Sequence, residues 1–347
     1  MYKIDHKKIL EQYICLPTKV DFLLPDLDLE VISTTVIRKT SNSLITGFLY
    51  VINWKENKVL KKIPVPIKGS SKFWNDRGGN RGGRGILKYQ DKLYIATESS
   101  LRVYDSGYNF IGEINNEKFA GLHEICADKD GFWITSTVHD LVLKIDHNGK
   151  IIDEWFGSES KKLLERFSIK PRFLNIGLNF EKDNFKNKYD EYCMQERLHV
   201  NSVNIAGHSV YVYCPKIMSL IKIRPLPEEV VMHDKTLIKG HNGIMTDDNK
   251  IIVNDTINQA VRIYDATSGC LIKIISTMIY DEHLSEQFAR AGWQRGLMKV
   301  TDQIYLVGTS PATVFELDIE NNFIGKIFKL DSKLSHCVHG LYAFMKS

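Results

Sequence analysis

The feature that most constrains the fold is a strand pattern that recurs along the chain. In five copies an apolar residue precedes a large residue by eight positions, as Ile86–Tyr94, Ile125–Trp133, Val203–Tyr211, Ile244–Ile252 and Leu297–Tyr305. Turn-forming residues such as Asp130-Gly131 lie between the two, so each copy predicts a hairpin. A third strand follows every hairpin, and a fourth follows most of them. Units of four short strands repeating every roughly 40–55 residues are typical of β-propellers.

A sixth unit is split between the two ends of the sequence. Residues 339–344 match only the first strand of the pattern, and residues 31–38, 47–54 and 58–65 supply three more. Pairing the ends closes the ring and removes its free sheet edges. The sequence therefore predicts an all-β, six-bladed β-propeller with four antiparallel strands per blade. The last blade is closed by N- and C-terminal strands, and residues 1–347 form a single domain.

Two segments interrupt the period. Residues 158–197 lie between the second and third units and begin with a helical pattern behind Ser158 as the cap, with Lys161 where a capping box would have Glu. Residues 281–292 precede the fifth unit and predict a short helix ending at Gly292. Both segments precede an innermost strand, so both should lie over one face of the ring. Such insertions serve either as lids over a site or as surface additions without a role in binding. For residues 158–197 we consider a lid.

Composition and charge narrow the class of protein. Of the 347 residues 43% are hydrophobic and 25% charged, with a net charge of +4, too small to indicate a nucleic-acid partner. The glycine- and arginine-rich stretch Trp74–Tyr89 stops after a few residues and lacks the lysine of a phosphate-binding loop. No segment is apolar enough to be a signal peptide or a membrane span. Six scattered cysteines favour reduced thiols, so we expect a cytoplasmic protein with neither nucleic-acid nor membrane partners.

A ring of polar residues is predicted where the innermost strands begin. Two positions before each aligned apolar residue stand Arg84, His123, Asn201, Asn242, Arg295 and His339. The first strand of a blade lines the central channel, so this position points one side chain per blade at the axis. Side chains two positions apart on a strand share a face, so the positions two residues earlier also point at the axis. They add His199, Trp293 and Cys337 to the ring. Glycines stand between, at Gly85, Gly243, Gly296 and Gly340, where strands crowd near the axis.

One interpretation of this ring is a pocket for an anion. Arg295, His339, Arg84 and His123 come from neighbouring blades, and arginine presents a fork of donors suited to carboxylate, sulfate or phosphate. We expect His123 and His339 to be catalytic residues that transfer protons or ligate a metal ion. The expected substrate-binding residues are Arg84, Arg295, Asn201, Asn242 and Trp293. The alternative is that axial residues only hydrogen-bond backbone carbonyls and channel water.

A second interpretation is a metal site. His123, His199 and His241 lie at the starts of three consecutive innermost strands and could hold one divalent metal ion with an open position for water or substrate. His241 stands one register off, so this requires the strand to bulge. Weaker candidates are Glu98 and Asp255 as general bases and Cys337 as a nucleophile.

Residues 121–155 and 240–275 resemble repeats of the NHL-repeat and gluconolactonase-like superfamily of six-bladed propellers. The resemblance covers almost the whole chain and implies the fold. That superfamily includes lactonases, lyases such as the peptide-amidating lyase, and non-enzymatic binding scaffolds. Its lactonases hold a divalent cation with Glu, two Asn and Asp. The resemblance assigns Asn201, Asn242 and Asp255 to the last three, whereas Arg84 stands where the Glu is expected.

Together these observations predict an enzyme of lyase or hydrolase type, with or without a metal ion. It would act on a small anionic molecule at one mouth of the channel. The alternative is a non-catalytic propeller scaffold that binds a ligand or a protein partner.

Overall fold

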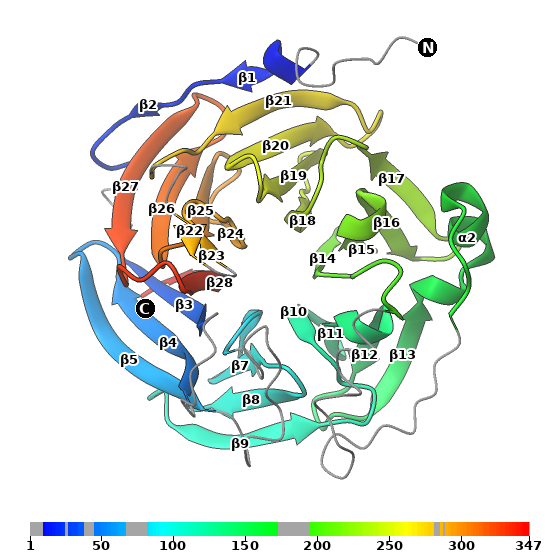
Figure 1. Ribbon diagram of the computed structural model, residues 1–347. Helices are drawn as coiled ribbons and strands as arrows, with labels where there is room; N and C mark the ends of the chain where they lie inside the picture. Colours follow the sequence, from blue (N-terminus) through cyan, green and yellow to red (C-terminus); the bar gives the residue numbers. More distant parts are fainter. Residues whose placement is uncertain are drawn as a thin grey trace.

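Six four-stranded antiparallel sheets surround a central axis in the computed structural model (Figure 1). The structure describes residues 10–24, 27–37, 45–66, 82–172, 195–280, 285–286 and 289–346. We number the sheets as blades 1 to 6 and count the strands of each blade outwards from the axis. The predicted all-β, six-bladed propeller is confirmed.

The first three blades follow one another along the chain. Blade 1 contains β6 (Ile86–Tyr89), β7 (Lys92–Ala96), β8 (Ser100–Tyr104) and β9 (Phe110–Asn115). Blade 2 contains β10 (Leu122–Asp128), β11 (Gly131–Ser136), β12 (Leu141–Ile145) and β13 (Ile151–Phe156). Blade 3 contains β14 (Ser202–Ala206), β15 (Ser209–Cys214), β16 (Ser219–Arg224) and β17 (Glu229–His233). Short 3-10 turns follow three of these strands, η2 (Thr137–His139), η3 (Gly157–Glu159) and η4 (Pro215–Ile217).

The remaining blades complete the ring. Blade 4 contains β18 (Gly240–Met245), β19 (Lys250–Asp255), β20 (Ala260–Asp265) and β21 (Leu271–Ser276). Blade 5 contains β24 (Gly296–Lys299), β25 (Ile304–Thr309), β26 (Thr313–Asp318) and β27 (Phe323–Lys329). Blade 6 contains β28 (His336–Met345), β3 (Leu29–Ile37), β4 (Ile45–Asn53) and β5 (Lys58–Pro66).

Blade 6 closes the ring as predicted. The C-terminal strand β28 is its innermost strand and pairs with β3 from His336–Ile37 to Met345–Leu29. The N-terminal strands are the outer three strands of the same sheet. Each gap between neighbouring blades is filled by its own apolar cluster, so six clusters hold the ring together.

The N-terminal segment makes an addition that the sequence pattern did not indicate. Two short strands, β1 (Ile14–Cys15) and β2 (Thr18–Lys19), pair in parallel with β21 and β27 on the outside of blades 4 and 5 (Figure 1). The fully buried Glu316 anchors the chain that follows. Its carboxylate accepts the Leu23 backbone N–H at 2.7 Å and the Trp54 indole N–H at 2.6 Å.

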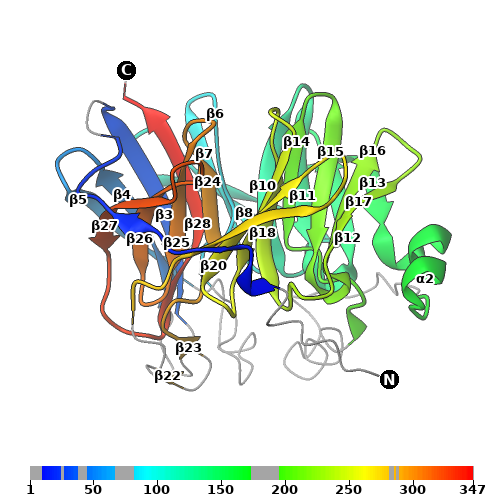
Figure 2. The same ribbon diagram turned by 90° about the horizontal axis from the view of Figure 1, so that it is seen from above.

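The two insertions differ from each other. Helix α2 (Lys161–Phe167) begins the first. Its cap is Ser160, whose hydroxyl accepts the Leu163 N–H at 3.2 Å, and the predicted cap Ser158 is wrong because it lies in the preceding 3-10 turn η3. Residues 173–194, on which the lid prediction rests, lie outside the described residues. In the second, the predicted helix is wrong, because β22 (Ser285–Glu286) and β23 (Ala289–Arg290) form a small hairpin. Short isolated helices are marginal in water, so a local helical pattern alone did not decide the structure of this segment. Figure 2 shows this hairpin projecting from the face where β28 begins.

Glycines between the axial residues and the strands allow neighbouring blades to approach, as predicted. A Cβ on Gly340 would lie 1.9 Å from the backbone oxygen of Arg84, and one on Gly85 would lie 2.6 Å from the Cα of Glu124. Both obstacles are backbone atoms, which cannot move aside as a flexible side chain would. Glycine is therefore required at these positions.

We expect Gly340→Ala to lower the free energy of unfolding by roughly 1–3 kcal/mol or more, because overpacking forces blades 6 and 1 apart. Gly112→Ala is the matched control, since a Cβ on that strand glycine meets nothing within 4 Å. Urea unfolding of both variants measures the difference. Equal stabilities would show that the blades do not approach as closely as described.

No helix among the described residues is long and apolar enough to cross a membrane. The cytoplasmic location expected from the sequence stays a prediction.

Candidate metal centre

Three histidines converge on the axis of the ring. His123 on β10, His241 on β18 and His339 on β28 each offer a ring nitrogen, and these nitrogens lie within 4.8 Å of one another. The side chains are buried, with exposed fractions of 7%, 7% and 3%. They come from blades 2, 4 and 6, which alternate around the ring. Alternate blades therefore give the three imidazoles a roughly trigonal arrangement.

Each histidine stands at a β-bulge of an innermost strand. The register shifts between Leu122 and Ile125 in β10, between His241 and Gly243 in β18, and between Val338 and Gly340 in β28. A bulge inserts an extra residue and re-aims the neighbouring side chains. In β18 the extra residue is Asn242, whose φ is +52°. This bulge turns His241 to the axis, as the metal interpretation required.

Asn242 consequently has a different place from the one predicted. Its Nδ2 donates to Glu124 Oε2 at 2.9 Å, and its Oδ1 accepts the His241 Nδ1 proton at 2.6 Å. His241 takes the place in the axial ring that was predicted for Asn242, so His123, His241 and His339 alternate with Arg84, Asn201 and Arg295 from blades 1, 3 and 5.

Hydrogen bonds fix the protonated nitrogen of two of the imidazoles. His123 Nδ1 lies 2.8 Å from the carbonyl oxygen of Gly121, which can only accept, so Nδ1 carries the proton and Nε2 keeps a lone pair. The bond from His241 Nδ1 to Asn242 Oδ1 places the proton on Nδ1 of His241 as well. The His241 ring also has a hydrogen-bond interaction with the Arg295 backbone. Nδ1 of His339 is buried and has no hydrogen-bond partner among the described residues. Metal-binding histidines are usually oriented by such outer hydrogen bonds.

The electrostatic environment keeps the three rings neutral. Burial, followed by the charge of Arg84, lowers the pKa of His123 well below its ordinary value. Burial lowers the pKa of His241 to about 4. Burial and the neighbouring His241 lower that of His339 well below the usual range. Neutral imidazoles with free lone pairs are the form that binds a metal ion.

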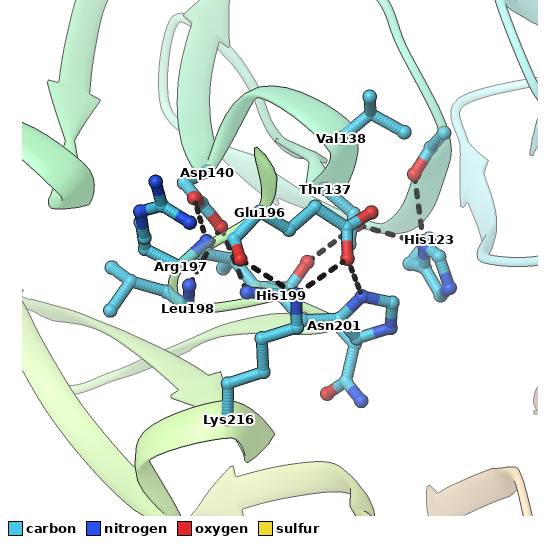
Figure 3. Close-up of polar contacts among 12 residues, drawn as sticks. His123, Thr137, Val138, Asp140, Glu196, Arg197, Leu198, His199, Asn201 and Lys216 are labelled. Carbon is cyan, nitrogen blue, oxygen red and sulfur yellow. Dashed lines mark hydrogen bonds and ion pairs between the residues drawn. The ribbon is translucent and has the colours of Figure 1, made fainter. Parts of the chain in front are cut away.

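His199, predicted as a metal ligand, lies beside the centre and is not one of the converging three. Its ring centroid is 5.3 Å from that of His123, and its Nδ1 is bound to Glu196 Oε2 at 2.7 Å. Although burial raises the pKa of Glu196, the charges of His199 and Lys216 hold it below its ordinary value. Figure 3 shows this pair beside His123. The converging group contains His339 in place of His199.

Asp140 fixes the backbone that carries this pair. Its fully buried carboxylate accepts the backbone N–H groups of Arg197, Leu198 and His199 at 2.5, 2.9 and 2.8 Å (Figure 3). His199 is thereby held at a φ of +58°, a conformation that few residues other than glycine adopt without such support.

Arg84 is already engaged within the protein. Its guanidinium forms a buried ion pair with Glu98 and donates to the Leu122 carbonyl at 2.7 Å. Nη1 also lies 3.3 Å from His123 Nδ1. Glu98, considered from the sequence as a general base, therefore neutralises the arginine that was expected to bind the anion. Arg84 supports the strand that carries His123.

Asn201 and Arg295 keep polar atoms without partners. Asn201 is 1% exposed; its Nδ2 donates to the Gly240 carbonyl at 3.3 Å, and its Oδ1 has no partner among the described residues. Arg295 Nε is also buried without a hydrogen bond, and its guanidinium lies 5.3 Å from the Trp293 ring centroid. No described carboxylate forms an ion pair with Arg295. Arg84 Nε is likewise buried without a hydrogen bond among the described residues, so unpartnered polar atoms are not confined to these two side chains.

Glu124 is a polar residue of the axis that the sequence interpretation missed. Burial raises the pKa of its carboxyl group to about 8. It stands at the register position where four other blades have glycine, and its carboxylate oxygen would lie 2.5 Å from a Cβ on Gly85. A charged residue at a position that four other blades fill with glycine was the available signal.

The remaining candidates have structural contacts. Both carboxylate oxygens of Asp255 accept hydrogen bonds from Asn258, and the Arg262 guanidinium forms a buried ion pair with it. Cys337 is fully buried. With Asn242 bound to His241 and Asp255 to Arg262, the described residues do not form the asparagine–aspartate cation site implied by the lactonase resemblance.

No family model matches the chain, and no curated protein matches its sequence. Solved structures resemble it in fold. One is a protein of unknown function from Bacteroides caccae, 9% identical, with a TM-score of 0.52 over 90% of this chain and 100% of that chain. Another is a nidogen/laminin complex, 8% identical, with a TM-score of 0.54 over 91% of this chain and 98% of that chain. At these identities the likeness shows the propeller fold alone.

Proposed function

We propose that the protein is a metal-dependent enzyme of lyase or hydrolase type that acts on a small anionic substrate at the mouth of the channel. The observation that carries the proposal is the convergence of His123, His241 and His339, two of them with their outer nitrogen already hydrogen-bonded. Membership of the NHL-repeat and gluconolactonase-like superfamily is part of the same proposal and rests on the resemblance of the repeats.

The donor set favours zinc or a similar borderline divalent ion. Three neutral ring nitrogens suit Zn²⁺, whereas Mg²⁺ and Ca²⁺ prefer oxygen ligands. Metal–nitrogen bonds of about 2.0–2.1 Å need the nitrogens to be roughly 3.4 Å apart. The imidazoles, whose nitrogens lie within 4.8 Å of one another, would therefore turn inwards by a small movement on binding. Three protein ligands leave a coordination position open.

A bound ion would supply Lewis-acid polarisation of a substrate oxygen or activation of a water molecule. His123 and His339 then act as ligands, and the proton-transfer role predicted for them passes to another group. His199 is suited to it, because Glu196 holds its Nδ1 proton and its ring lies beside His123. Arg295 offers the donors for an anionic group, with Trp293 against it, and Asn201 Oδ1 offers an acceptor.

The test of the proposal is elemental analysis of protein purified without chelators. We expect about one zinc or similar ion per chain, and hydrolase or lyase activity on anionic substrates that disappears on metal removal and returns with added metal. Metal-free protein that cannot be loaded and that captures a single partner would instead support the non-catalytic scaffold.

Arg295 provides a separate test of the anionic substrate. With inorganic phosphate as the probe on zinc-loaded protein, Arg295→Gln should lose roughly 2–5 kcal/mol of binding free energy, as expected for a partly desolvated charge contact. The melting temperature should stay close to that of the wild type, because no described ion pair is broken. Arg166→Gln, on helix α2, is the matched control and should bind normally. Titration calorimetry gives both values, and equal phosphate affinity in the two variants would remove Arg295 from the site.

A further inference from the structure

A hydroxyl group holds each of the three bulges that carry the candidate ligands. In β10 the Thr135 Oγ1 accepts the backbone N–H groups of His123 and Glu124 at 3.2 and 2.9 Å. These two residues lie opposite Thr135 alone, because Leu122 pairs with Ser136 and Ile125 with Ile134. The hydroxyl thus replaces the carbonyl that a regular ladder would offer.

Hydroxyl groups also bind the other two bulges, from the paired strand β3 in blade 6 and from the neighbouring blade, β14, in blade 4. Thr34 Oγ1 accepts the Gly340 N–H at 3.0 Å and donates to the Arg84 carbonyl at 2.5 Å. Ser202 Oγ accepts the Gly243 N–H at 3.1 Å and donates to the Gly243 carbonyl at 3.0 Å. Glu124, Gly243 and Gly340 occupy the same register position, directly after the bulge. All three hydroxyl residues are buried.

The axial residues of blades 1, 3 and 5 also pair irregularly. Arg84 N–H donates to the Ala96 carbonyl at 2.8 Å although Ala96 N–H donates to Gly85, and Asn201 and Arg295 donate to Tyr213 and Gly308, the partners of Ser202 and Gly296. The hydroxyl contact is what distinguishes blades 2, 4 and 6, because Gly85 N–H of blade 1 donates to the His123 carbonyl at 2.7 Å instead. In the described hydrogen bonds, hydroxyl and histidine therefore occur together in alternate blades.

We propose that Thr34, Thr135 and Ser202 are positioning residues that set the three imidazoles for one metal ion. The inference rests on the metal site of the proposed function. A strand has a side-chain period of two, so loss of the extra residue would turn the histidine away from its present direction. The hydroxyls stabilise the bulged backbone by satisfying N–H groups that the ladder leaves without a carbonyl.

Cobalt(II) is the probe for this proposal, because its visible absorption reports coordination geometry as well as affinity. Wild-type protein should bind one Co²⁺ with the spectrum of a site of low coordination number. Thr135→Val, which keeps the shape and removes the hydroxyl, should weaken Co²⁺ binding about 10–100-fold and alter the spectrum, the usual effect of losing an outer partner of a ligand. Thr135→Ser should restore both.

A second pair of variants separates positioning from general stability. Ser202→Ala should weaken Co²⁺ binding in the same way as Thr135→Val. Thr246→Ala is the matched control, because Thr246 Oγ1 likewise accepts from and donates to one residue, Lys250, at 3.0 and 2.9 Å, at the opposite end of β18. It should lose stability in urea without losing Co²⁺ affinity.

The outcomes are distinguishable. If the wild type binds no Co²⁺, the metal site itself is overturned and the positioning role with it. If the wild type binds and Ser202→Ala or Thr135→Val binds equally well with an unchanged spectrum, the hydroxyls do not position the ligands. Should Thr135→Val fail to fold, Ser202→Ala against Thr246→Ala decides the question.

Discussion

A chain that ends at Ser335 should not fold. The deletion removes β28, the innermost strand of blade 6, and leaves the inner edge of β3 without its partner. It also removes the fully buried Cys337 and Val338, and with Val338 and Leu341 part of the apolar cluster between blades 5 and 6. The ring would open at a long hydrophobic edge, which is a site for aggregation. Expression should give insoluble protein.

The matched control removes the N-terminal segment, whose strands lie on the outside of the ring. A chain beginning at Asp21 lacks β1 and β2, and blades 4 and 5 return to four strands. Leu16 and Ile14, lost in this deletion, are largely exposed. This chain should remain soluble and unfold cooperatively by circular dichroism. A soluble, cooperatively folding C-terminal deletion would contradict closure of the ring by β28.

Replacing one ligand should abolish the metal site and spare the fold. His241→Ala should lower zinc affinity by more than about a hundredfold, beyond the effect expected for an outer partner. The ring of His241 lies at the axis, outside the six interblade clusters, so the apo protein should melt near the wild-type apo temperature. Because a ligand that binds only the folded state stabilises it, zinc should raise the melting temperature of the wild type alone.

The control for this variant is His208→Ala, an exposed histidine in the turn after β14. It should bind zinc and melt as the wild type does, with and without a chelator. Scanning calorimetry with zinc titration measures both effects. If His241→Ala retains full zinc affinity, the ion binds elsewhere and the three histidines are structural.

The fold was predictable because its signal is repeated. The eight-residue spacing from Ile86–Tyr94 to Leu297–Tyr305 recurs in five blades, and period two places one residue of each innermost strand at the axis. The split blade followed from residues 339–344, which match the first strand of the pattern without the three strands that should follow it. Strands β1 and β2 could not be predicted, because two-residue strands carry no periodicity.

The residue types of the site could be predicted from the sequence, but the directions of their side chains could be predicted only in part. The sequence placed His123 and His339 at the axis, but a bulge of one residue decides whether Asn242 or His241 points inwards. The N–H that follows this bulge is bound by the Ser202 hydroxyl of the neighbouring blade, a contact that the pattern along one strand does not include. The Arg84–Glu98 ion pair joins the residue before β6 to the residues after β7. It too is a contact between two strands, so the pattern along one strand does not indicate it.

The most direct measurement of the central claim is a crystal structure of zinc-soaked protein with anomalous data on both sides of the zinc absorption edge. We predict one strong anomalous peak on the axis, about 2.0–2.1 Å from one nitrogen each of His123, His241 and His339. A water molecule at that position in the presence of excess zinc, or imidazoles hydrogen-bonded only to one another, would contradict the metal centre.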